Sequence, residues 1–256
     1  MTQIAAPSLV ADEEVQLRRE LAAVYRLLAH FRMTDLIFTH VSVRVPGPEH
    51  HFLINPYGLM FDEITASSLV KVGLDGNLVE ESAYQVNPAG FVIHGAIHAA
   101  REDAHCVLHT HTKAGCAVAA QRAGLLPLNQ ISMEFYNRVG YHDYHGIALN
   151  TAERESLVAD LGSNPALVLR NHGLLTVGRS PAEAFLRMFY LEKACEIQIA
   201  AQAGGELNLP SEELAEYTAR QFAGEVVDEF NDDRAYELAW EALLRMLDRI
   251  AHDCTL

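Results

Sequence analysis

The spacing of apolar positions predicts one helix, a run of short strands, and then helices and strands in alternation. Apolar residues recur at helical spacing over residues 12–31, from Val15 to Leu28, which predicts an amphipathic helix after a mobile arm over residues 1–11. Residues 36–80 predict short strands at HVSVRV, HFLINP and VKVGL. The Asp75-Gly76 pair predicts a hairpin turn from VKVGL into NLVE.

The second half of the chain predicts a layered arrangement of helices and strands. FVIHGAIHAAR predicts a helix, HCVLHTH a buried strand, and ERESLVADLG a helix ending at Gly162. ALVLRNHG and GLLTVG predict two strands joined by a turn. A long helix follows from SPAEAF to IAAQA, with Ser180 as N-cap, Pro181 at N1 and Glu183 at N3. Residues 211–256 predict C-terminal helices.

No linker rich in Pro, Gly or Ser divides the chain, and no internal repeat is visible. We therefore expect residues 1–256 to form a single α/β domain with one mixed sheet. Half of the residues are hydrophobic and 21% are charged, which is typical of a globular protein with a sizeable core.

Charge and cysteine content exclude several classes of function. The chain has 34 acidic and 19 basic residues, so its formal net charge is -15. This balance argues against a nucleic acid or a membrane surface as partner, because both favour basic proteins. The four cysteines form no Cys-x-x-Cys pair, which predicts reduced thiols, neither a disulfide framework nor a thiolate zinc site. With no leader and no apolar run of spanning length, we expect a cytoplasmic protein.

Histidine is the residue type that stands out. Of the 13 histidines, five lie between residues 94 and 111. His109 and His111 are two residues apart at the end of a predicted strand, so their imidazoles share one face. Two nitrogen donors on one face make half of a zinc-type site. Taken alone, the pair is a weak signal, and two polar residues at a strand end are its simpler explanation.

His172 is a possible distant third ligand. It falls in the predicted turn between two hydrophobic strands, directly before Gly173. A turn histidine exposed to water is the simpler interpretation of this residue by itself. The combination with His-x-His is far more specific than either feature alone.

With these motifs, the sequence resembles the class II aldolase/adducin family. The resemblance is strongest to the adducin-like branch, which comprises the head domain of adducin and its bacterial relatives. The resemblance extends from about Leu17 to Gln202 and rests on HVSVR, FLINPYGLMFDEITASSLVKV, NPAGFVIHGAIHAAR, CVLHTHTKAG, YHDYHGIAL and LRNHGLLTVG. It implies a three-layer α/β/α fold with a central, largely antiparallel sheet. It also implies a homotetramer with active sites at subunit interfaces. The implied metal ligands are His109, His111 and His172, with zinc as the expected ion and manganese or iron as alternatives.

Three positions depart from the pattern of the family's sugar-phosphate aldolases. Their Ser-Ser-Glu motif, whose glutamate acts as acid and base, corresponds here to Pro88-Ala89-Gly90. Their phosphate loop corresponds to Asn55-Pro56-Tyr57-Gly58, and their asparagine before VS to His40. Because glycine cannot transfer a proton, we do not expect cleavage of a phosphorylated ketose through the usual glutamate.

Other side chains must then donate or accept protons. The candidates lie in a segment whose counterpart in the family is near the active site. They are Tyr141, His142 and His145, with Glu134 upstream. Strand alternation predicts Tyr141, Asp143 and His145 on one face and His142 with Tyr144 on the other, so only one set can face the metal. Structural hydrogen bonding of a polar edge explains these residues equally well.

His94 lies one helical turn after Gly90 and is a candidate for orienting a metal ligand from behind, although a purely structural role is the simpler interpretation. His98 and His105 are predicted at the surface.

Two functions fit these observations. The first is a divalent-metal-dependent lyase that performs aldol cleavage or decarboxylation of a small oxygenated carbonyl or carboxylate compound. The second is a non-catalytic adducin-like module for assembly or protein binding. Gly90 favours the second function, because adducin also lacks the glutamate. The three retained histidines favour the first.

Overall fold

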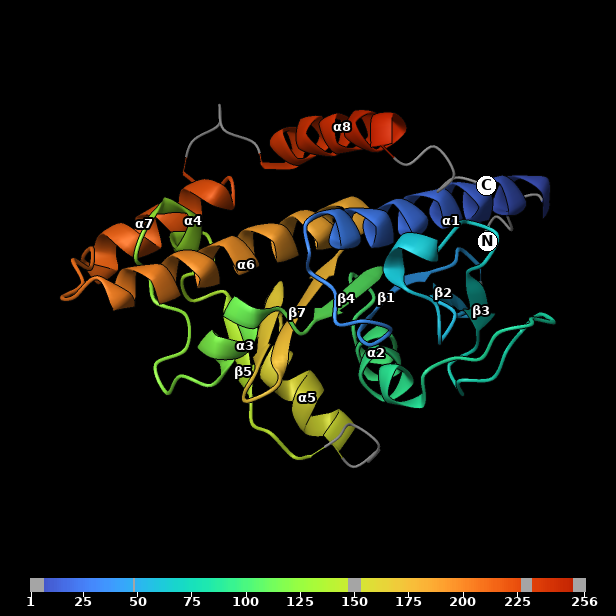
Figure 1. Ribbon diagram of the computed structural model, residues 1–256, viewed down its shortest axis with the longest axis horizontal. Helices are drawn as coiled ribbons and strands as arrows, with labels where there is room; N and C mark the ends of the chain where they lie inside the picture. The colour runs from blue at the N-terminus through green and yellow to red at the C-terminus, as the bar shows by residue number, and fades with distance from the viewer. Residues whose placement is uncertain (1–6, 48, 147–152, 227–231, 251–256) are drawn as a thin grey trace.

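The protein is a three-layer α/β/α structure, seen in a computed structural model that describes residues 7–47, 49–146, 153–226 and 232–250 (Figure 1). Its central sheet has seven strands in the order β3-β2-β1-β4-β7-β6-β5. All neighbouring strands are antiparallel except β5 and β6, which are parallel. The strands are β1 (His40–Arg44), β2 (Phe52–Ile54), β3 (Val70–Val72), β4 (Cys106–Thr110), β5 (Val139–His142), β6 (Ala166–Leu169) and β7 (Gly173–Gly178). The expected α/β fold with a largely antiparallel sheet is confirmed.

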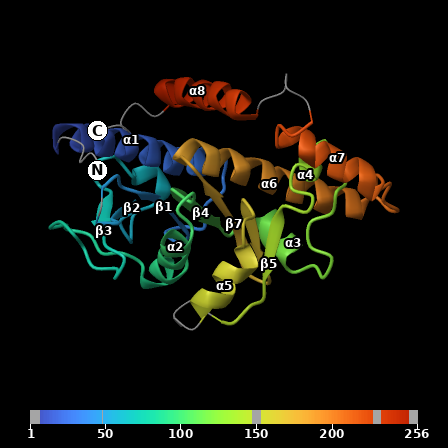
Figure 2. The same ribbon diagram turned by 180° about the vertical axis from the view of Figure 1, so that it is seen from behind.

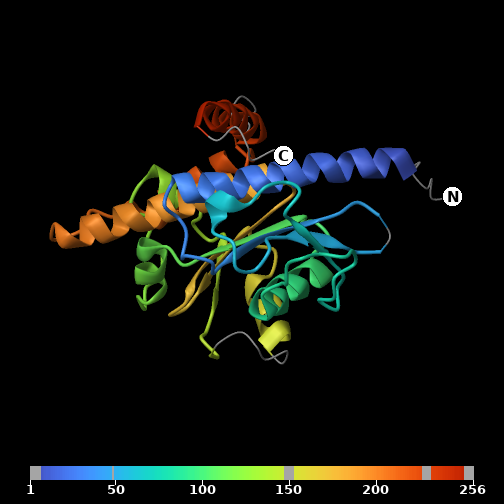
Figure 3. The same ribbon diagram turned by 45° about the vertical axis from the view of Figure 1, so that its right-hand side comes forward.

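Helices cover both faces of the sheet (Figures 1 and 2). One face carries α1 (Pro7–His30) and α6 (Pro181–Ala203), with α8 (Asp232–Ile250) packed on them from outside (Figure 3). The other face carries α2 (Pro88–Ala100) and α5 (Arg154–Leu161). The shorter elements are η1 (Phe61–Glu63), α3 (Lys113–Ala119), α4 (Gln130–Met133) and α7 (Glu212–Phe222). None of the helices in the described ranges is long and apolar enough to cross a membrane.

Alternation along β4 assigns each residue to one of two hydrophobic clusters. Cys106 and Leu108 pack with α1 and α6, whereas Val107 packs with Ile93 and Ile97 of α2. The period of two therefore turns His109 to the same side as Val107, towards α2 and α5. The position of the histidines follows from the pattern that builds the core.

Several predicted boundaries can be compared with the structure. The first helix begins at Pro7, five residues before the predicted start, so residues 7–11 of the expected arm are helical and residues 1–6 lie outside the described ranges. Ser180 caps α6 and accepts a hydrogen bond from the Glu183 amide, as predicted. The predicted turn at Asp75-Gly76 is present: the chain returns antiparallel to β3 through a bridge between Val72 and Leu78, and the Val79 amide donates to the Lys71 carbonyl at 2.9 Å. NLVE does not, however, form a regular strand. The short helices α3 and α4 were not predicted.

Tyr25 joins α1 to two strands through one buried hydroxyl. This hydroxyl accepts a hydrogen bond from the Val41 amide (2.7 Å). It lies 2.6 Å from the Val41 carbonyl oxygen and 2.9 Å from Oδ1 of Asn55, and these two acceptors compete for its single proton. Val41 follows His40 at the start of β1, so Tyr25 fixes the strand end that lies beside His109.

We predict that Tyr25→Phe lowers the free energy of unfolding by about 1–3 kcal/mol, because the buried Val41 amide loses its acceptor. Urea denaturation monitored by circular dichroism measures this change. Tyr217→Phe, at an exposed position of α7, is the matched control. Equal denaturation midpoints for the two variants would contradict the role assigned to the Tyr25 hydroxyl.

Candidate metal centre

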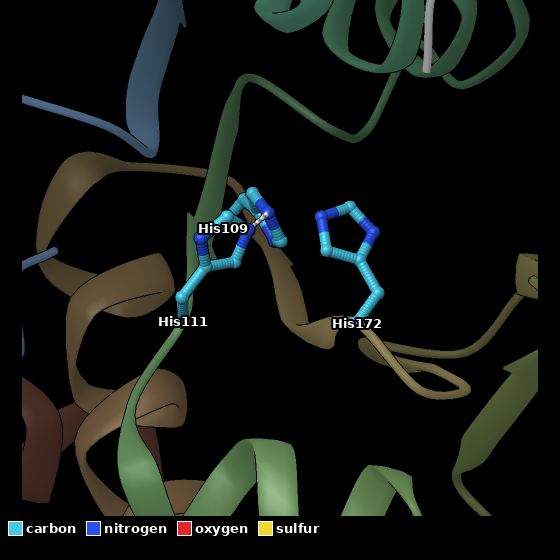
Figure 4. Close-up of side chains that lie close together, drawn as sticks. All are labelled: His109, His111 and His172. Carbon is cyan, nitrogen blue, oxygen red and sulfur yellow. Dashed lines mark hydrogen bonds between the residues drawn. The ribbon is translucent and has the colours of Figure 1, made fainter. Parts of the chain in front are cut away.

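Three histidines from two segments meet at one end of the sheet (Figure 4). His109 is on β4, His111 follows that strand, and His172 lies in the turn between β6 and β7. Antiparallel pairing of β4 with β7 brings this turn beside the end of β4. The ring centroids are 4.7 to 4.8 Å apart, and one nitrogen of each ring lies within 4.8 Å of the others. The structure thus brings the three predicted ligands together.

The turn that carries His172 depends on a glycine. A Cβ at Gly173 would lie 2.3 Å from the Thr110 carbonyl oxygen, so no other residue fits there without separating β7 from β4. Asn171 adopts a left-handed conformation with φ 57°, which asparagine tolerates better than most residues. The Cys116 thiol donates to the His172 carbonyl at 3.0 Å. The Asn-His-Gly sequence therefore sets the backbone path of the turn.

Hydrogen bonds fix which nitrogen of His109 and His111 carries the proton. Nδ1 of His109 lies 2.8 Å from the Leu174 carbonyl oxygen, and Nδ1 of His111 lies 2.9 Å from Oδ2 of Asp35. A carbonyl and a carboxylate can only accept, so both Nδ1 atoms donate. Where both rings carry only this one proton, both Nε2 atoms present lone pairs. These two atoms face each other at 2.9 Å, a contact that either a further proton or a metal ion bound by both nitrogens would satisfy.

This donor set fits a divalent metal ion. Two imidazole nitrogens around a tetrahedral ion stand about 3.3 Å apart, from a metal–nitrogen distance of about 2.0–2.1 Å. The observed 2.9 Å needs only a small widening. Burial, followed by the neighbouring imidazoles, lowers the pKa of His109 well below its ordinary value. Burial likewise lowers the pKa of His172 to about 4. Both rings are neutral at pH 7, which is the form that binds a metal.

Two acidic residues that the sequence reasoning missed support the centre. Asp35 orients His111 from an irregular segment, so no local pattern could reveal it. Glu192 accepts hydrogen bonds from the Thr112 hydroxyl and the Gly115 amide directly after His111, and burial raises its pKa. Glu192 lies in α6 between Leu191 and Cys195, which are both buried. A charged residue in a stretch of helix that otherwise faces the core is a signal that sequence reasoning could have used.

A second group of histidines lies behind the centre, on α2 and β1. The Ser42 hydroxyl lies 2.7 Å from both His94 Nδ1 and His98 Nε2, and His98 Nδ1 donates to the Ala104 carbonyl at 2.9 Å. His98 is thus fully buried, and its predicted surface position is wrong. Its Nε2 must accept from Ser42, so Ser42 accepts from His94 and leaves the His94 Nε2 atom as a bare acceptor.

His40 lies between this group and the candidate metal ligands. Its ring centroid is 4.3 Å from that of His94 and 5.7 Å from that of His109. Within the described residues, His94 makes no hydrogen bond to a candidate metal ligand, so it contacts the centre through the His40 ring. Both His40 nitrogens are buried without a hydrogen-bond partner, and burial lowers the pKa of His40 to about 3.

The absence of a side chain at Gly90 leaves room for the His40 ring. A Cβ at Gly90 would lie 2.9 Å from Cδ2 and from Nε2 of the His40 ring. The imidazole thus fills the space that a side chain at position 90 would need. Two of the three departures noted in the sequence, at Gly90 and His40, are consequently one spatial arrangement.

The candidate proton-handling residues lie in three different places. Tyr141 packs with the cluster on the α6 side, where its hydroxyl accepts from the Leu125 amide at 3.1 Å and its ring lies 4.7 Å from the Arg170 guanidinium. Glu134 accepts from the Tyr236 hydroxyl at 2.6 Å. It lines a cavity of about 620 Å³ beside Gly178, at the opposite end of β7 from His172.

His142 and His145 lie together, with ring centroids 5.2 Å apart. The expected alternation does not continue beyond His142, because β5 ends there. Tyr144 is the residue of this segment whose ring lies near the centre, 6.3 Å from His172.

Comparison with known proteins agrees with this geometry. Residues 19–199 match the family model described as Class II Aldolase and Adducin N-terminal domain. A Caulobacter vibrioides protein whose name places it in aldolase class 2 is 53% identical over 94% of this chain and 92% of its own. Rat alpha-adducin is 44% identical over 93% of this chain, which spans 34% of that protein. The solved L-fuculose 1-phosphate aldolase from Glaciozyma antarctica has a TM-score of 0.81 and 28% identity, covering 97% of this chain and 95% of its own.

We predict that Gly90→Ala lowers the free energy of unfolding by about 1–3 kcal/mol, the usual cost of overpacking a core. In an ordinary helix the same change is stabilising, because alanine has the higher helix propensity. In a His40→Ala background the added methyl group has room, so the substitution becomes neutral or stabilising there. Urea denaturation of the four chains measures this difference. An equal cost in both backgrounds would contradict the contact between His40 and Gly90.

Proposed function

The chain belongs to the class II aldolase and adducin family, and on this premise we propose that it is a divalent-metal-dependent carbon–carbon lyase. Its substrate is a small oxygenated carbonyl or carboxylate compound, which it splits by aldol cleavage or by decarboxylation. The ion is zinc, with manganese or iron as alternatives, because three imidazoles accommodate all three metals.

The observation that carries this proposal is the open coordination of the three-histidine group. Within the described residues, no cysteine or carboxylate completes the set formed by His109, His111 and His172. Catalytic metal sites keep a position for water or substrate, whereas structural sites are closed by four protein ligands. When bound, the ion draws electron density from a carbonyl oxygen and so eases cleavage of the adjacent carbon–carbon bond.

The chain's own residues orient the ligands and supply a proton. The Leu174 carbonyl and Asp35 hold the rings of His109 and His111 with Nε2 turned inward. Tyr144, which is 51% exposed and lies near His172, is the proton donor that the geometry favours over Tyr141 and Glu134. Gly90 brings no carboxylate to the site, so the proposal excludes the family's glutamate route for a phosphorylated ketose.

We further propose that the protein acts in the cytoplasm as a homotetramer, with sites at subunit interfaces. Light scattering on the purified protein tests the assembly. A tetramer has about four times the chain mass of 28.3 kDa.

A non-catalytic adducin-like module is the second candidate, and the 44% identity to rat alpha-adducin favours it. Such a module needs no metal. Metal bound at the three-histidine centre therefore separates the two candidates.

We predict that protein purified without chelator contains a divalent metal ion, and that His172→Ala abolishes this binding to the centre. At a free ion concentration 100 times Kd, binding raises the free energy of unfolding by about 2.7 kcal/mol. Elemental analysis and thermal melting with Zn²⁺, Mn²⁺ or Fe²⁺ measure the two effects. His105→Ala, at an exposed position, is the matched control.

Activity is then assayed as release of CO₂ or of a carbonyl fragment from unphosphorylated β-hydroxy carbonyl and carboxylate compounds. Activity in the wild type that is absent from His172→Ala supports the lyase. If the wild type contains no metal and gains no thermal stability from any of the three ions, the adducin-like module is the better description.

We also predict that Asp35→Asn weakens metal binding 10–100-fold, the usual effect of removing a carboxylate that orients a histidine ligand. Calorimetric titration of metal-stripped protein with Zn²⁺ measures this change. Asp62→Asn, at an exposed acidic position, is the control. An unchanged affinity in Asp35→Asn would show that the carboxylate does not set the His111 ring.

A further inference from the structure

A second group of potential ligands lies where β5 ends and α5 begins. His142 is the last residue of β5, His145 follows three residues later, and Glu153 immediately precedes α5. One ligand atom from each lies within 4.8 Å of the other two. None of these residues belongs to the three-histidine centre on β4 and the β6–β7 turn.

The hydrogen bonds of His142 cannot all be satisfied by a neutral ring. Its Nδ1 lies 2.7 Å from Oδ2 of Asp160, and its Nε2 lies 3.0 Å from Oε1 of Glu153. Both partners are carboxylate oxygens, and a neutral imidazole has one N–H. One of the two contacts therefore joins two acceptors, unless a cation lies there. The Nε2 atoms of His109 and His111 make the same kind of contact at 2.9 Å.

A proton on His142 would satisfy two carboxylates, but the group has a third member. The His145 ring centroid is 5.2 Å from that of His142, and its nitrogen lies within reach of the same point. An imidazolium gains nothing from a further imidazole beside it. A metal ion takes three or more ligands, so it accounts for His142, His145 and Glu153 together.

Asp160 completes the arrangement. Metal-bound histidines commonly donate their other N–H to a carboxylate, which fixes the ring and strengthens the ligand. Asp160 is in this position on the Nδ1 side of His142, with Nε2 turned towards Glu153. The side chain of His142 is only 3% exposed, and that of Glu153 is 10% exposed.

We propose that His142 Nε2, His145 and Glu153 bind a second divalent cation of the zinc type, with Asp160 orienting His142. An ion at this place would also connect the end of β5 to the turn that carries His172. The His142 carbonyl accepts from the Arg170 amide at 2.8 Å, two residues before His172. The second ion therefore ties the end of β5 to α5 and fixes the segment that carries Tyr144 beside the first centre.

The test counts Zn²⁺ equivalents bound by metal-stripped full-length protein, using calorimetric titration. We expect two equivalents for the wild type, one for His145→Ala and one for His172→Ala, with none for the double variant. His145 is exposed, so its replacement should leave the fold intact. Asp160→Asn should weaken only the second site, by about 10–100-fold. His105→Ala is the control and should bind two equivalents.

The outcomes separate this site from the proposed function. One equivalent in the wild type that survives His145→Ala and disappears in His172→Ala overturns the second site, and leaves a proton between His142 and Glu153. One equivalent that disappears in His145→Ala and survives His172→Ala supports the second site and overturns the catalytic centre. No bound zinc in the wild type overturns both.

Discussion

In a neutral imidazole, one ring nitrogen must present a lone pair when the other donates its N–H to a fixed acceptor, and the candidate site depends on this constraint. The Leu174 carbonyl sets it for His109 and Asp35 sets it for His111. Leu174 belongs to β7 and pairs with Thr110 of β4. The sheet itself therefore decides which atom of His109 faces the centre. Strand pairing thus sets the tautomer of His109, and the tautomer sets which atom can act as a ligand.

Glycine contributes as much to this end of the molecule as histidine does. Gly173 lets β7 approach β4 closely enough for His172 to reach the other two rings, and Gly90 leaves room for the His40 imidazole. His40 keeps two buried nitrogens without partners, which is costly in a folded protein. Such a cost is common where a polar group serves function, and here the unpartnered ring lies beside His109, a proposed metal ligand.

Sequence reasoning succeeded where one local rule decides the outcome. The period of two placed His109 and His111 on one face, and hydroxyl capping placed the start of α6 at Ser180. It failed where distant contacts decide. His98 has the sequence environment of a surface residue, yet Ser42 and Ala104 satisfy both of its nitrogens in the core. The resemblance implies an active-site segment that contains Tyr141, with Glu134 upstream of it, but Tyr141 packs on the α6 side and Glu134 lies at the opposite end of β7 from His172. Asp35 could not be found because irregular segments have no period.

The alternation of β4 has a further consequence. Cys106 and Leu108 face α6, while Val107 and His109 face α2 and α5. A slip of this strand by one residue would exchange the two faces, expose the apolar set to the wrong helices and turn His109 away from His172. The grouping of the three histidines thus requires the same register of the strand as the hydrophobic core. One pairing register decides both which residues are buried and which donor atoms meet at the end of the sheet.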